Sequence, residues 1–184
     1  MTTAPAHASA ADPSKLSWAI SGSGSGLAAA RSPAAGGDAP RLHHVTALGS
    51  AEPPADCRRW DGLTYLRYSI AGDDEPSAIA RGEAVVAACK HLLTIGINPD
   101  VLIVHSGWGE ARNLRQPFPT TPLIVFPEIW GHPKALGYGF DQHLDGHTSD
   151  PLWFEQQNQL CAEAIYTSNV AIVPCKAQAQ SFPA

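Results

Sequence analysis

Polar and aromatic side chains follow each of three apolar stretches that have the composition of buried strands. Residues 105–110 (HSGWGE) follow the first stretch, residues 127–132 (PEIWGH) follow the second, and residues 174–178 (PCKAQ) follow the third. In open parallel sheets, ligands bind in the crevice beyond the carboxyl ends of the strands. The sequence therefore predicts a binding site built from the segments that come directly after these stretches.

The first of these segments holds side chains that suit sugar chemistry. The His105 imidazole can hydrogen-bond a hydroxyl or carry a proton, and the Trp108 indole offers a face for a sugar ring. Gly107 and Gly109 permit a close approach of backbone, and Glu110 opens a predicted helix, where its carboxylate also suits the helix dipole. Each residue alone has a structural alternative, such as core packing for Trp108. Their grouping in one loop favours a functional site.

A long polar loop follows the second stretch, over residues 127–150, and its acidic and imidazole side chains raise the question of a metal site. These residues are His132, His143, His147, Asp141, Asp145 and Asp150. Their spacing matches no zinc pattern, so a solvated polar loop is the favoured interpretation. We predict no metal site and no cofactor from this loop.

A glycine-rich segment near the amino end keeps a different function open. Residues 24–29 (GSGLAA) fit the pattern GxGxxA after residues 16–20, and Glu52 lies beyond the next predicted strand. This is a weak dinucleotide fingerprint in a low-complexity setting. The alternative it supports is a small NAD-binding module that uses Gly24 and Gly26.

Composition excludes several other classes. The chain has 184 residues, which suits one domain, and a formal net charge of −5, which gives no basic field to hold nucleic acid. No apolar run approaches the roughly 18 residues of a membrane span, although peripheral contact with a membrane stays open. The start does not have the pattern of a secretory signal. The four cysteines contain no CxxC pair, which argues against a zinc clip or a disulfide framework. A cytoplasmic protein is therefore predicted.

The order of elements predicts an α/β fold with a Rossmann-like, mainly parallel sheet flanked by helices. Residues 1–40 are rich in Ala, Ser, Gly and Pro, and within them only residues 16–20 have the pattern of a strand. Residues 41–184 form the predicted domain. Its expected strands are 43–48, 63–68, 101–104, 123–126 and 170–173, and its expected helices are 78–94, 110–116 and 152–166.

Residues 98–110, NPDVLIVHSGWGE, resemble a signature in the N-terminal domain of a bacterial group within glycosyltransferase family 4. Further stretches resemble that group in order. They are Arg81–Val85, Phe118-Pro119, Thr121–Ile124, Glu128, Gly139–Asp141, Asn158, Gln178 and Phe182-Pro183. The likeness covers roughly residues 41–184. The chain departs from the group at Gln142, His143, Cys175 and Ala177.

The resemblance implies the N-terminal half of a GT-B glycosyltransferase, in which a second Rossmann-like domain holds the nucleotide-sugar donor. It implies a retaining transfer to a sugar or glycan acceptor. His105 and Glu110 are the expected catalytic residues. The expected substrate-binding residues are Gly107, Trp108, Gly109, Glu128 and Asp141.

Because the donor domain is not within these 184 residues, we expect little or no activity from the chain alone. A truncated, non-catalytic sugar-binding fragment is the alternative.

Overall fold

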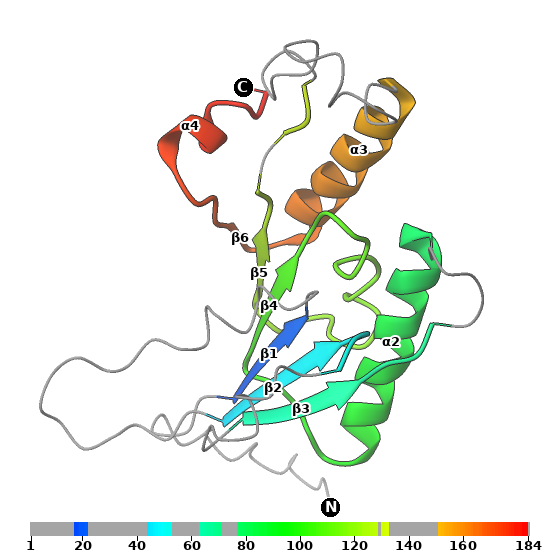
Figure 1. Cartoon of the computed structure of the whole chain (residues 1–184). Coiled ribbons are helices and arrows are strands. Elements are labelled where there is room, and N and C mark those ends of the chain that lie inside the picture. The colour runs from blue at the N-terminus through cyan, green and yellow to red at the C-terminus, as the bar shows by residue number, and fades with distance from the viewer. Residues whose placement is uncertain are drawn as a thin grey trace, which may run out of the picture.

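The computed structural model describes residues 17–21, 44–52, 63–70, 77–128, 130–132 and 151–183. Its strands form one sheet in the order β3-β2-β1-β4-β5-β6 (Figure 1). The strands are β1 (Ser17–Ser21), β2 (His44–Gly49), β3 (Leu63–Arg67), β4 (Val101–His105), β5 (Leu123–Phe126) and β6 (Val170–Ala171). Each of the five pairings between them is parallel, which confirms the predicted mainly parallel α/β sheet.

The strand β1 lies inside the sheet, between β2 and β4. Its residue Ala19 is in register with Thr46 on one side and with Leu102 on the other. Residues 17–21 therefore belong to the sheet, although they lie within the stretch that the sequence marks as low in complexity.

Two long helices cover one face of the sheet. Helix α2 (Ala78–Thr94) begins where the Ser77 hydroxyl accepts a hydrogen bond from the amide of Ala80, at 3.2 Å, and it ends at Ile95. Gly96, at φ 83°, then turns the chain in the left-handed conformation that glycine adopts readily. Helix α3 (Pro151–Thr167) leads toward β6. Neither these nor any other helix that the structure describes is long and apolar enough to span a membrane.

The main core lies between these helices and the central strands (Figure 1). It contains buried side chains from α2, β4, β5 and α3, among them Val85, Leu92, Val104, Val125 and Ala164. The alternate residues of β4, which include His105, are half-buried. Because alternate side chains of β4 are buried against the helices, this alternation fixes the direction of the His105 side chain.

The predicted helix over residues 110–116 is wrong, because this segment is a run of turns. Asn113 adopts φ 58°, a left-handed conformation that interrupts α-helical geometry and that asparagine tolerates better than most residues. Ala111 and Leu114, within this segment, are buried in the core together with Phe118. A short helix that was not predicted, α4 (Lys176–Ala179), follows β6.

Candidate functional site

The strand order places a topological switch point between β1 and β4. From β1 the next two strands run toward one edge of the sheet, and from β4 the next two run toward the other. Crevices at such points, beyond the carboxyl ends of the strands, are the usual ligand sites of open parallel sheets. His105 is the last residue of β4, in register with Phe126 at the end of β5. The sheet therefore places His105 at the carboxyl end of β4, next to the switch point where such crevices form.

The His105 imidazole lies between a backbone amide and a carboxylate. Its Nδ1 accepts a hydrogen bond from the amide of Gly107 at 3.1 Å, and its Nε2 lies 3.6 Å from Oε1 of Glu128. Because Nδ1 is the acceptor, the neutral ring carries its proton on Nε2, which faces Glu128. The imidazole is mostly buried, whereas the Glu128 carboxylate is exposed. The structure thus brings together two residues that the sequence places 23 positions apart, with a donor beside an acceptor.

The two glycines of the loop after β4 are required for different reasons. A Cβ at Gly107 would lie 3.0 Å from Cε1 of His105, so a side chain there would crowd the imidazole. Gly109 has φ 99°, and a Cβ there would lie 2.2 Å from the carbonyl oxygen of Ala78. Gly109 therefore lets the loop pack directly against the amino end of α2.

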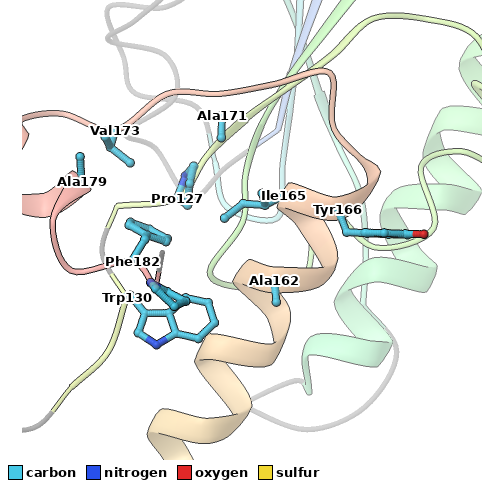
Figure 2. A pocket seen from close by; sticks show the side chains of 10 residues that line it. Pro127, Trp130, Ala162, Ile165, Tyr166, Ala171, Val173, Ala179 and Phe182 are labelled. Atoms are coloured by element: carbon cyan, nitrogen blue, oxygen red, sulfur yellow. The ribbon is translucent and has the colours of Figure 1, made fainter.

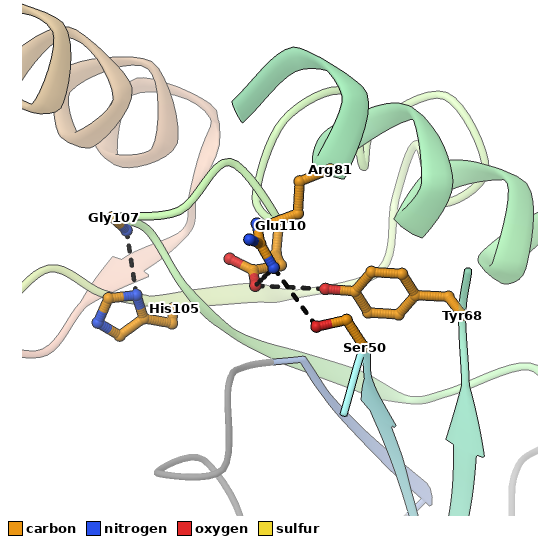
Figure 3. A network of polar contacts seen from close by, with 6 residues as sticks. All are labelled: Ser50, Tyr68, Arg81, His105, Gly107 and Glu110. Carbon is orange, nitrogen blue, oxygen red and sulfur yellow. Dashed lines mark hydrogen bonds and ion pairs between the residues drawn. The ribbon is translucent and has the colours of Figure 1, made fainter. Parts of the chain in front are cut away.

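Glu110 lies beneath the surface, with 0% of its side chain exposed. Its Oε1 accepts a hydrogen bond from the Tyr68 hydroxyl at 3.3 Å and lies 3.8 Å from the guanidinium of Arg81, which also lies 3.5 Å from the hydroxyl of Ser50. Figure 3 shows the carboxyl group of Glu110 between His105 and Tyr68. Such a carboxylate can hold Arg81 and Tyr68 in place, and a substrate would reach it only if neighbouring side chains moved.

Burial sets the ionisation behaviour of this network. Burial raises the pKa of Glu110 above its ordinary value, and the positive charge of Arg81 and the nearby His105 only partly oppose that rise. Burial and the nearby carboxylate of Glu110 together raise the pKa of Tyr68. The second carboxylate oxygen of Glu110, Oε2, is buried and has no hydrogen-bond partner among the described residues.

Trp108 projects from the loop, and 51% of the residue is exposed. This exposure argues against the core-packing alternative for Trp108. The indole lines a cleft of ≈ 650 Å³ between the amino end of α2 and helix α3, which Trp153 lines as well.

The segment that follows Glu128 is fastened to α3 and to the carboxyl end of the chain. The Asn158 side chain accepts a hydrogen bond from the Gly131 amide at 2.7 Å and donates one to the Gly131 carbonyl at 2.8 Å. The amide of Trp130 donates to the Ser181 hydroxyl at 2.9 Å, and the Trp130 ring meets the Phe182 ring edge-on at 5.9 Å. These contacts restrain the backbone close to the carboxylate that faces His105.

A second cavity, lined by apolar side chains, lies between α3 and the carboxyl end of the chain (Figure 2). It has a volume of ≈ 490 Å³. Its lining side chains are aliphatic or aromatic, among them Trp130, Ile165, Tyr166, Val173 and Phe182. Few groups in it could orient a polar substrate.

Some predicted residues lie outside the described part of the chain. They are Asp141, His143, His147, Gly24 and Gly26. Within the described residues, no group of three or more His, Cys, Asp or Glu side chains could hold a metal ion. Sequence reasoning missed the roles of Ser50 and Tyr68 because their partners, Arg81 and Glu110 respectively, are distant in the chain. Arg81 could have been found, since it begins one of the stretches that resemble the family.

Comparison with known proteins agrees with the resemblance in the sequence. A family model described as glycosyl transferase family 4 group matches residues 43–184. No curated protein matches the chain.

Proposed function

The chain belongs to the glycosyl transferase family 4 group, and we propose that it forms the acceptor-binding side of a retaining glycosyltransferase. The family supports glycosyl transfer from a sugar donor to an acceptor in general terms. In the proposal, the acceptor hydroxyl lies at the carboxyl ends of β4 and β5. A nucleotide-sugar donor is presented from a second domain across that opening.

The observation that carries the proposal is the pairing of His105 with Glu128 at the switch point of the sheet. The imidazole Nε2–H can donate a hydrogen bond to a sugar oxygen, and the exposed Glu128 carboxylate, 3.6 Å away, can accept one from a hydroxyl. A donor and an acceptor at this separation suit two neighbouring oxygens of a polyhydroxylated substrate. Catalysis by such a site is mostly positioning and electrostatic stabilisation.

The other residues of the site support this pair. Gly107 fixes the imidazole through its backbone amide, and Gly109 seats the loop on α2. Trp108 offers an exposed ring face beside the reacting groups. Glu110 is buried, and it acts as a positioning residue through its contacts with Arg81 and Tyr68. Asp141 remains a predicted acceptor contact.

Two measurements test the proposal. The purified chain of residues 1–184, given UDP-glucose, UDP-N-acetylglucosamine or GDP-mannose with a glycan acceptor, is expected to show no transfer above background. Steady transfer by this chain alone would contradict an acceptor-side role. When the chain is joined to a donor-binding domain, the product's anomeric proton coupling, measured by NMR, should show the donor's configuration. An inverted product would contradict the retaining mechanism.

A further inference from the structure

We propose that the cleft between α2 and α3 is a separate subsite for a neutral oligosaccharide, which holds the acceptor chain at a distance from the reacting hydroxyl. This inference rests on the proposed function and deepens it, because it assigns the acceptor to a chemical class. The cleft has a volume of ≈ 650 Å³, which falls in the range of roughly 300–1,000 Å³ typical of ligand sites.

Two exposed indoles from different elements line the cleft. Trp108 comes from the loop after β4, and Trp153 comes from the first turns of α3. They are 51% and 40% exposed, respectively, which is unusual for the largest apolar side chain. Indole faces stack on the apolar faces of sugar rings, so two of them provide places for two sugar units of one chain.

Side-chain amides lie on the same face of α3 as Trp153. Gln156 and Gln157 follow Trp153 by three and four positions, which places them one helical turn further along. Both line the cleft, and the side-chain amide of neither bonds another residue that the structure describes. A glutamine amide both donates and accepts, as a sugar hydroxyl does. The combination of indole faces with unpaired amides therefore fits a carbohydrate better than a purely apolar ligand.

The charges of the cleft favour a neutral chain over a phosphorylated or acidic one. Two of its lining residues are arginines, and both have an acidic partner. Arg112 lies 3.5 Å from Glu163, and Arg81 lies 3.8 Å from the buried Glu110. Recognition of an anion normally uses an unpaired cation with several free donors. The described lining residues of this cleft offer no such cation.

The backbone connects the cleft to the proposed reaction site. Gly107 lines the cleft, and its amide donates the 3.1 Å hydrogen bond that fixes the His105 imidazole. A chain held by Trp108 and Trp153 therefore lies against the loop that directly follows His105. Binding in the cleft would place an acceptor end close to the reacting groups and would select for acceptors longer than one sugar.

A binding titration tests this assignment without requiring transfer. Isothermal titration calorimetry of the chain of residues 1–184 uses cellohexaose, maltohexaose and chitohexaose as probes. At least one is expected to bind, and Trp153→Ala should weaken that binding about 10-fold or more. Gln157→Leu, which removes the amide and keeps the helix, should also weaken it. The matched control is Tyr166→Ala, since Tyr166 is an aromatic residue of the same helix that is 91% exposed and does not line the cleft.

Each outcome decides for or against the subsite. Loss of binding in Trp153→Ala and Gln157→Leu but not in Tyr166→Ala, with circular dichroism melting curves unchanged, supports it. No binding of any probe at about 10 mM, equal loss in the Tyr166 variant, or tighter binding of an acidic hyaluronan hexasaccharide overturns it. Oligosaccharide binding, together with no glycosyl transfer after the chain is joined to a donor-binding domain, would contradict the proposed function and leave the subsite standing. Transfer by the joined protein, with unchanged oligosaccharide binding in Trp153→Ala, would contradict the subsite and leave the proposed function standing.

Discussion

Replacement of Gly109 by alanine tests whether the loop after β4 is held in place by direct packing on α2. Two costs follow from the structure. The first is the backbone conformation, since φ 99° is unfavourable for any residue with a Cβ, by about 1–2 kcal/mol. The second is steric, because the new Cβ would lie 2.2 Å from the Ala78 carbonyl oxygen and 2.8 Å from the Ala78 carbonyl carbon. Forced displacement of packed groups costs about 1–3 kcal/mol more.

Gly96 provides a matched control for the steric cost. It also has a left-handed backbone, at φ 83°, but a Cβ there would meet nothing within 4 Å. Gly96→Ala therefore carries the conformational cost alone. We expect Gly109→Ala to lower the free energy of unfolding by about 2 kcal/mol more than Gly96→Ala. For a chain of this length, that difference corresponds to roughly 4–8 °C in melting temperature.

Thermal unfolding followed by circular dichroism measures this difference. Both variants and the wild type are compared in one buffer, and urea titrations give the corresponding free energies of unfolding. Equal melting temperatures for Gly96→Ala and Gly109→Ala would refute the reasoning. That result would show that the amino end of α2 moves aside at no cost and that the loop is not seated as the structure describes.

Three further predictions concern the groups beneath and beside the site. Because burial raises the pKa of Glu110 above the ordinary 4.5, the folded state keeps a proton that the unfolded chain releases, and this group's contribution to stability falls as pH rises from 4.5. Wild type should therefore lose stability relative to Glu110→Gln across that range in urea titrations. Burial raises the pKa of the Cys89 thiol to about 12, and Cys161 is also buried, so among the three cysteines that the structure describes Ellman's reagent should modify exposed Cys175 before Cys89 and Cys161, which should react only after unfolding. Asn158→Ala should cost about 1–3 kcal/mol by leaving two backbone groups unpaired, and Asn158→Asp should not restore this stability, because an acceptor-only carboxylate would face the Gly131 carbonyl oxygen.

Each of these predictions has a clear contrary result. A constant difference in stability between wild type and Glu110→Gln over pH would show that the carboxyl group titrates normally. Modification of Cys89 in the native chain, identified by mass spectrometry of peptides, would contradict its burial. Equal melting temperatures for Asn158→Ala and wild type would show that the clamp on the backbone contributes nothing to stability.

Much of the fold could be predicted because local patterns and tertiary packing agree. The apolar runs at residues 101–104 and 123–126 are typical of parallel strands, and Ser77 and Gly96 mark the two ends of α2. The turns after Glu110 could not be predicted, because the sequence of residues 110–116 suits a helix as well as turns whose apolar side chains pack into the core. The left-handed backbone of Asn113 is decided by that packing.

Part of the candidate site could likewise be predicted from the sequence, and part of it could not. The meeting of His105 and Glu128 follows from a rule of topology, since they lie at the carboxyl ends of two strands that turn out to be neighbours. The burial of Glu110 could not be read from the sequence, because it depends on Tyr68 and Arg81, which approach from other elements. The role proposed for Trp153 likewise depends on how α3 lies against the loop that carries Trp108.

The most direct test of the central claim is the rate of sugar transfer by His105→Ala in a protein that contains this chain joined to a donor-binding domain. If His105 contacts the reacting sugars, kcat/KM should fall by about 100-fold or more while the melting temperature stays within about 2 °C of wild type. A loss of rate that merely follows a loss of folded protein would contradict the claim. In that case His105 would be a structural residue at the end of β4, held by the Gly107 amide and without a part in the transfer.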